Sequence, residues 1–110
     1  MANKNLVGTF VFRNEGDGCL TSKYFHGNQD YPFVEACKRQ RSSKPKEDGF
    51  DGLYTTVWIQ DDNIPQDSEL RIRWNKKGNT YNLTWSDNKK IIFQGIGMIY
   101  DELLVGAYWD

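Results

Sequence analysis

The sequence predicts an all-β fold: a small antiparallel up-and-down barrel, or a strongly coiled sheet, of about seven strands with one short helix. Three observations predict it. Apolar and polar residues alternate with a period of two along much of the 110-residue chain. Glycines recur two positions before aromatic residues in several of these segments. A chain of this length buries one modest core, so residues 1–110 are expected to form a single domain.

The first two predicted strands form a hairpin. Apolar residues alternate along Leu6–Asn14, and the glycine-containing sequence Glu15–Gly18 that follows is typical of a turn. The chain then returns as a second predicted strand, Cys19–His26.

The next segment, Pro32–Gln40, is predicted to be the short helix. Pro32 stands near a helix start, and Phe33, Val34 and Cys37 lie at helical spacing. The segment after it, residues 41–49, contains few hydrophobic residues. That composition indicates a mobile surface loop.

The clearest hairpin spans Glu69–Trp85. In each of its arms, large apolar residues occupy every second position, as in a sheet with one buried face and one wet face. These residues are Leu70, Ile72, Trp74, Tyr81, Leu83 and Trp85. The residues between the arms, 75–79, fit a loop of four or five residues in which Gly78 takes a positive φ.

Three further strands complete the predicted set. Gly52–Asp62 precedes the clear hairpin, and Pro65 is expected in the loop between them. The last two strands, 90–100 and 102–110, are expected to be joined by a tight turn at Asp101–Glu102.

Glycine weakens a strand, so its positions in these segments need a reason. In Gly8–Phe10, Gly52–Tyr54 and Gly106–Tyr108, an aromatic residue follows a glycine by two positions. The glycine and the ring then face the same side of the strand, and the ring can lie over the missing side chain. Glycine also allows a strand to coil sharply. These glycines are therefore predicted to be bending points at which the sheet curls until its first and last strands meet.

A first strand with the Gly8–Phe10 motif, a series of antiparallel hairpins and a final glycine–aromatic strand resemble the calycin group of up-and-down barrels. This group includes lipocalins, fatty-acid-binding proteins and avidins. The resemblance is architectural and extends over most of the chain. In lipocalins and avidins the aromatic residue of the first strand is usually Trp, where this chain has Phe10. The chain is also shorter than those proteins usually are, which counts against a spacious ligand cavity. Because the resemblance is architectural, it implies no particular binding residues.

The net charge, the hydropathy and the cysteine count indicate which partners and which cellular location to expect. The formal net charge of −1 excludes steering of the whole molecule towards nucleic acid or an anionic membrane. The opening residues 1–10 contain no apolar core of signal-peptide length, and no segment approaches the roughly 18 apolar residues of a transmembrane helix. A cytoplasmic location is therefore expected. Two cysteines are fewer than a disulfide-stapled domain usually carries, so reduced thiols are favoured over a single bridge.

No motif in the chain indicates catalysis or a bound metal. A thiol nucleophile would need a basic partner, but Cys19 and His26 face opposite sides of one predicted strand, and neither Cys19 nor Cys37 follows a glycine motif at a helix start. The spacing of Cys19, His26 and Cys37 matches no zinc pattern, and the acidic segment 61–69 lacks the ligand order of a calcium loop. We therefore expect neither an enzyme nor a metal or other cofactor.

Four tryptophans and six tyrosines make the chain rich in aromatic residues. The candidate ligand-binding residues are Trp58, Trp85, Tyr54 and Tyr108, whose rings could line a pocket at the barrel mouth for a small apolar molecule or a sugar. The alternative is that these rings are the core, because a small barrel has little else to fill it. The function favoured by the sequence is a non-enzymatic binding or interaction domain with a small-molecule ligand.

A single-stranded nucleic-acid binder of the OB type is the second hypothesis. Residues 38–46 carry five positive charges, and Arg71 and Arg73 lie on a strand rich in aromatic residues. However, Trp74 and Trp85 are expected on the face opposite the two arginines. Nucleic acid is therefore the less favoured partner, no membrane partner is expected, and the oligomeric state is left open.

Overall fold

The computed structural model describes residues 7–27, 31–40, 49–59 and 65–110. Within these ranges the chain forms strands and no helix, so no helix there could span a membrane. The strands are β1 (Val7–Gly16), β2 (Cys19–His26), β3 (Phe33–Arg39), β4 (Gly52–Ile59), β5 (Pro65–Asn75), β6 (Thr80–Asp87), β7 (Lys90–Tyr100) and β8 (Leu103–Trp109).

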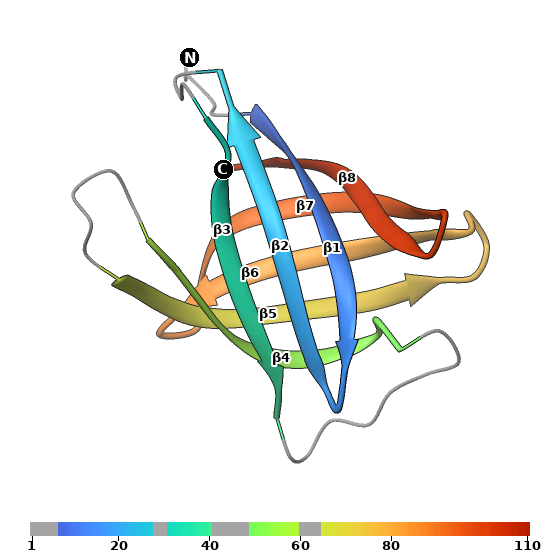
Figure 1. Cartoon of the computed structure of the whole chain (residues 1–110), viewed down its shortest axis with the longest axis horizontal. Coiled ribbons are helices and arrows are strands. Elements are labelled where there is room, and N and C mark those ends of the chain that lie inside the picture. The colour runs from blue at the N-terminus through green and yellow to red at the C-terminus, as the bar shows by residue number, and fades with distance from the viewer. Residues whose placement is uncertain (1–6, 28–30, 41–48, 60–64) are drawn as a thin grey trace.

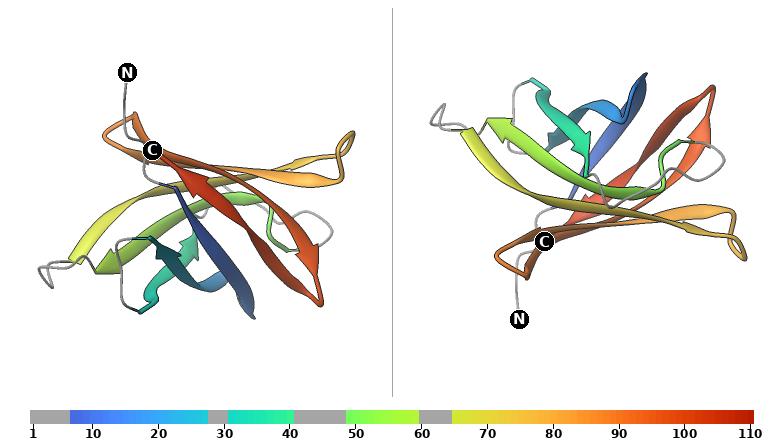
Figure 2. Two further views of the ribbon diagram at one scale, coloured as in Figure 1. Left: turned by 90° about the horizontal axis from the view of Figure 1, so that it is seen from above. Right: turned by 90° about the horizontal axis from the view of Figure 1, so that it is seen from below.

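The eight strands form one closed barrel. Each strand pairs antiparallel with the next along the chain, and β1 also pairs with β8 (Figure 1). Figure 2 shows the same barrel from above and below, with the strands of its opposite walls crossing at a steep angle. Closure confirms the predicted all-β up-and-down barrel, with eight strands in place of about seven.

The predicted helix at Pro32–Gln40 is wrong, and its residues supply the additional strand. Phe33–Arg39 forms β3 and pairs with both β2 and β4. Burial along it has a period of two: Glu35 and Cys37 are buried, while the residues on either side of each are exposed. Three apolar residues at helical spacing are a weak local preference, and pairing with two neighbouring strands outweighs it.

Two local predictions about the loops are also wrong. Pro65 is the first residue of β5, where proline is tolerated, and does not lie in a loop. In the four-residue loop between β5 and β6, the positive φ falls on Asn79, at 57°, and not on Gly78. The tight turn at Asp101–Glu102 is confirmed, with φ of 54° and 69°. The loop predicted for residues 41–49 lies outside the described residues except for Gly49.

Glycines on β7 and β8 make room for the ring of Phe10. A Cβ atom added to Gly95, Gly97 or Gly106 would lie 3.3, 3.2 or 2.8 Å from that ring. At Gly106 it would also overlap the backbone carbonyl of Ile96. The ring therefore lies over three missing side chains, and it does so where β1 meets β8 and closes the barrel.

The two ends of the barrel differ. We call the end where β1 begins and β8 ends the N/C end, and the opposite one the far end. In the far half, many interior side chains are only 0–1% exposed: Phe12, Leu20, Tyr54, Leu70, Ile72, Tyr81, Leu83 and Leu104.

A short segment before β4 covers the far end. Phe50 is buried there and its ring packs against Tyr81. The Tyr54 hydroxyl donates a hydrogen bond to the Phe50 carbonyl (2.8 Å), and the Arg39 guanidinium donates to the Gly49 carbonyl (2.7 Å) and to the Tyr54 oxygen (2.8 Å). These contacts hold the segment against the core and close this end.

Candidate ligand site inside the barrel

Among the described residues, Glu35 of β3 is the one acidic side chain that is buried inside the barrel. The strand register places polar residues beside it. Ser22 of β2 is its direct partner across the β2–β3 ladder, and Thr56 of β4 is the partner of the next inward residue of β3, Cys37. Ser22 and Thr56 are buried as well. Three adjacent strands thus bring a carboxyl group and two hydroxyl groups together inside an otherwise largely apolar core.

Side chains from β2, β4 and β6 donate hydrogen bonds to the Glu35 carboxylate. The Thr56 hydroxyl and the Trp85 indole N–H, the latter at 2.9 Å, both donate to Oε2. The Ser22 hydroxyl donates to Oε1 at 3.3 Å. The Cys37 thiol in turn donates to the Thr56 oxygen at 3.3 Å, which leaves the Thr56 proton free for Glu35.

All these donors are neutral. No lysine, arginine or histidine in the described part of the chain forms an ion pair with Glu35. Burial raises the pKa of Glu35, because the charged form loses its hydration, and the hydrogen bonds with Thr56, Trp85, Ser22 and Cys37 oppose this only in part. The site therefore holds a carboxyl group whose ionised form has no cationic partner in the described part of the chain.

Aromatic rings form the walls between Glu35 and the N/C end. The Tyr108 ring lies at the centre of this group, with centroid distances of 6.1 Å to Trp85, 5.7 Å to Phe93 and 6.2 Å to Tyr24. The pKa of Tyr108 is raised to about 12, first by burial and then by the nearby Glu35 charge. The Tyr108 hydroxyl is therefore protonated at neutral pH.

Exposure increases towards the N/C end. Tyr108 is 6% and Trp58 is 9% exposed, and Tyr24 and Phe93 are only half-buried. The rings on this side of Glu35 thus have slightly more contact with solvent than the interior side chains of the far half, whereas Glu35, Ser22 and Thr56 are themselves only 0–3% exposed.

The structure brings together three of the four ring residues singled out from the sequence. Trp85 and Tyr108 are in contact, and Trp58 is the direct partner of Glu35 across the β3–β4 ladder. Tyr54 does not join them: it is fully buried in the far half and bonded to the segment that closes that end.

Glu35 itself was missed by sequence reasoning. The helical interpretation of Pro32–Gln40 hid it, because a glutamate within a short surface helix is unremarkable. The signal that could have found it is the alternation of Phe33, Glu35 and Cys37, which in a strand share one face. Such a row would place a carboxylate among buried side chains.

The other candidate chemistries do not form sites. Cys19 and Cys37 are free thiols, and the Cys37 pKa is raised, first by burial and then by the Glu35 charge, so this thiol is not activated as a nucleophile. The described residues contain no group of three or more His, Cys, Asp or Glu side chains that could hold a metal ion.

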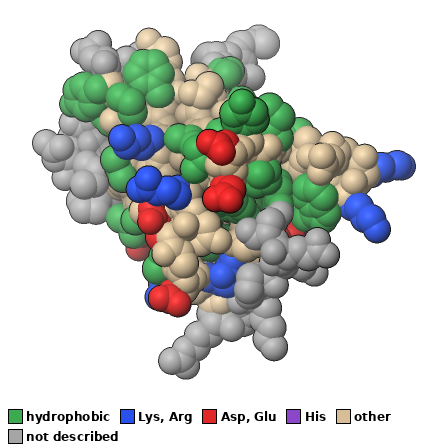
Figure 3. All heavy atoms as spheres, turned by 45° about the vertical axis from the view of Figure 1, so that its right-hand side comes forward, with side chains coloured by type: hydrophobic (Ala, Val, Ile, Leu, Met, Phe, Trp, Pro, Cys, Tyr) green, Lys and Arg blue, Asp and Glu red, His purple; other side chains and the backbone are tan. Residues whose placement is uncertain are grey.

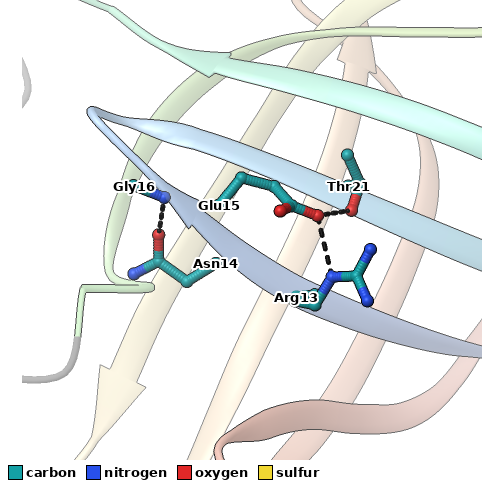
Figure 4. A network of polar contacts seen from close by, with 5 residues as sticks. All are labelled: Arg13, Asn14, Glu15, Gly16 and Thr21. Carbon is teal, nitrogen blue, oxygen red and sulfur yellow. Dashed lines mark hydrogen bonds and ion pairs between the residues drawn. The ribbon is translucent and has the colours of Figure 1, made fainter.

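A second polar network lies on the surface of the β1–β2 hairpin (Figure 4). Oε2 of Glu15 accepts hydrogen bonds from Thr21 (2.5 Å) and from Arg13 (2.8 Å), and these two bonds lower the Glu15 pKa. Nearby, Asn14 Oδ1 accepts a hydrogen bond from the Gly16 N–H at 2.8 Å, beside the β-bulge. This network shapes the hairpin, and its carboxylate already has a cationic partner.

In the described residues, the arginines of β5 do not share a face with the Trp85 ring of the same hairpin. On the face shown in Figure 3, acidic and basic side chains lie close together among hydrophobic ones. Arg71 and Arg73 are exposed, whereas Trp85 is buried inside. A single-strand-binding groove needs both groups on one surface, and the OB-fold is a five-stranded Greek-key barrel, so the observed arrangement does not favour nucleic-acid binding.

Comparison of the chain with protein-family models, with curated proteins and with solved structures found no significant match.

Proposed function

We propose that the protein is a non-enzymatic binding domain that takes one small, largely apolar molecule into the N/C half of its barrel, in the manner of calycin-like proteins. Eight-stranded barrels have an interior that is either filled by side chains or holds one small ligand. The observation that carries the proposal is the buried carboxyl group of Glu35, which has no cationic partner among the described residues and lies beside a group of aromatic rings at the less buried end.

A purely structural role explains Glu35 poorly. A buried carboxyl group without a cation destabilises the native state, and an apolar side chain of similar size would pack the same position without that cost. Perturbed ionisable groups of this kind cluster at functional sites. Aromatic walls with a few placed polar groups are the usual lining of a small-molecule site.

The proposal is tested with the neutral, environment-sensitive dye Nile red. We expect saturable binding with blue-shifted emission that does not change between low and moderate salt, since no phosphate or other charge drives it. Trp58→Leu, at the N/C end, should weaken the binding. Trp74→Leu is the matched control, because this ring is 39% exposed and lies beyond the far end of the core.

Three results would contradict the proposal. The native protein could fail to bind the dye, the two tryptophan variants could bind it equally well, or the affinity could fall steeply with salt, as for a nucleic-acid site. Far-UV circular dichroism on both variants establishes that the barrel is intact.

A further inference from the structure

We infer that the ligand of this site carries a cationic nitrogen, a protonated amine on an apolar or aromatic body, and that this nitrogen pairs with Glu35. The inference rests on the proposed function and names the ligand class. It starts from the difference between the two oxygens of the Glu35 carboxylate.

Oε2 of Glu35 is already fully engaged. The indole nitrogen of Trp85 can only donate, and the Thr56 hydroxyl is directed to act as a donor because it accepts from Cys37. Two donors on one oxygen use both of its lone pairs. A ligand therefore gains little by approaching Oε2.

Oε1 of Glu35 retains acceptor capacity. Among the described residues the Ser22 hydroxyl donates to it at 3.3 Å, which is longer than the usual O–H···O distance of about 2.7–2.8 Å. This oxygen is therefore bonded more weakly than Oε2. A donor supplied from outside the protein would complete this oxygen.

A second acceptor near the carboxylate is also unused. The Ser68 hydroxyl oxygen is buried and has no hydrogen-bond partner among the described residues. Ser68 is the direct partner of Thr56 across the β4–β5 ladder and belongs to the inward row of β5. The Tyr81 hydroxyl in the far half also lacks a partner among the described residues, so Ser68 supports the site through its place beside Thr56 and not through the missing bond alone.

The charge of the site selects among possible donors. A hydroxyl group of a neutral ligand would fill Oε1 but would do nothing to favour the ionised form of Glu35, which burial disfavours. A carboxylate ligand would add a second negative charge. An ammonium group donates to Oε1, has further N–H groups for Ser68, and compensates the charge, and a charge-assisted hydrogen bond is roughly twice as strong as a neutral one.

The aromatic walls favour the same ligand class. The electron-rich faces of Trp85, Trp58 and Tyr108 attract a cation that lies within about 6 Å of their centroids. The same rings provide apolar surface for the body of the ligand. Rings and carboxylate together are the usual means by which proteins hold an organic ammonium ion.

Affinities are measured by titration calorimetry for three probes with the same ring: 2-phenylethylamine, 2-phenylethanol and phenylacetate. We expect the amine to bind at least about tenfold more tightly than the alcohol, and phenylacetate to bind more weakly than either. This comparison uses the native protein and does not depend on any variant folding.

Variants then test which residues cause the preference for the amine over the alcohol. Glu35→Gln should remove the preference for the amine over the alcohol, whereas Glu102→Gln, an exposed acid in the β7–β8 turn, should keep it. Ser68→Ala should lower the affinity for the amine more than the affinity for the alcohol. Nile red binding is measured on each protein as a reference for an open site.

The possible failures are distinguishable. The inference of a cationic ligand is overturned if Nile red and the alcohol bind but the protein does not prefer the amine. It is also overturned if Glu35→Gln keeps the preference. In both cases the proposed binding function stands. If neither the dye nor any probe binds the native protein, both proposals are overturned.

Discussion

The Trp85 indole nitrogen donates a 2.9 Å hydrogen bond to the Glu35 carboxylate, joining side chains 50 residues apart in the sequence. Their strands, β6 and β3, are not neighbours in the sheet, so this bond crosses the barrel interior. It orients a wall ring of the proposed site and occupies one carboxylate oxygen. The bond thus determines which oxygen is left for a ligand.

Removal of this donor should destabilise the protein. Trp85→Phe keeps a ring in the wall but leaves Oε2 of Glu35 with Thr56 as its one donor. We expect a loss of about 1–3 kcal/mol in the free energy of unfolding, the usual effect of removing one partner of a buried hydrogen bond. Urea denaturation followed by circular dichroism measures the loss. Trp74→Phe, a change at a partly exposed ring, is the control and should stay within about 0.5 kcal/mol of the native protein. Equal losses in the two variants would contradict this role of Trp85.

The Glu35 carboxyl group should make stability fall as pH rises. Burial raises its pKa above the ordinary value of 4.5, so the native state holds this proton more tightly than the unfolded state. The resulting stabilisation is complete below pH 4.5 and is lost as the pH rises through the higher folded-state pKa.

The Glu35→Gln variant isolates this contribution. Relative to the native protein, it should gain stability with increasing pH above 4.5, by up to about 1.4 kcal/mol per pH unit. Two titratable neighbours of Glu35, Cys37 and Tyr108, both have raised pKa values and do not titrate in this range. A stability difference that is constant from pH 4 to pH 8 would show that the Glu35 pKa is not raised.

The contact between Gly106 and the neighbouring strand should make this glycine irreplaceable. A Cβ at this position overlaps the Ile96 carbonyl and approaches the Phe10 ring, so Gly106→Ala should destabilise the protein by about 1–3 kcal/mol. Backbone entropy alone predicts a gain for alanine. Gly27→Ala, where a Cβ would meet no atom within 4 Å, is the matched control and should be neutral or slightly stabilising. Urea midpoints for the two variants decide between these effects.

The β7–β8 turn offers a stabilising substitution. Glu102 has a φ of 69°, a left-handed conformation that is unfavourable for a residue with a side chain. Glu102→Gly should therefore raise the free energy of unfolding by up to about 1 kcal/mol. Glu102→Ala removes the same charge but keeps the strain, so it should give no such gain. Equal effects in thermal unfolding would assign the change to charge instead of conformation.

More of the fold than of the site could be predicted from the sequence. The alternation of apolar and polar residues along Leu70–Trp74 and Tyr81–Trp85 predicts a hairpin, because these strands are neighbours in the sequence. The Gly106–Tyr108 motif indicates a sheet that curls and closes. The segment 33–39 gave a weaker pattern, since the alternating row of Phe33, Glu35 and Cys37 contains a polar residue. Its strand conformation is fixed by pairing with β2 and β4, which this local pattern does not specify.

The site is made by contacts between strands that lie far apart in the sequence. Trp58, Trp85 and Tyr108 could be chosen as ring residues, but composition does not show which rings share an end, and Tyr54 belongs to the other one. The carboxylate that joins them depends on the barrel register, which aligns β3 with β2 and β4.

The most direct measurement is a two-dimensional NMR titration of the native protein with 2-phenylethylamine, observing the indole N–H signals of the tryptophans. The Trp85 signal should shift saturably, because its N–H donates to the carboxylate that the amine pairs with. The signal of Trp74, whose ring is partly exposed beyond the far end of the core, should stay in place. A Trp85 signal that does not move at saturating amine, or one that moves no more than that of Trp74, would contradict a ligand site at Glu35.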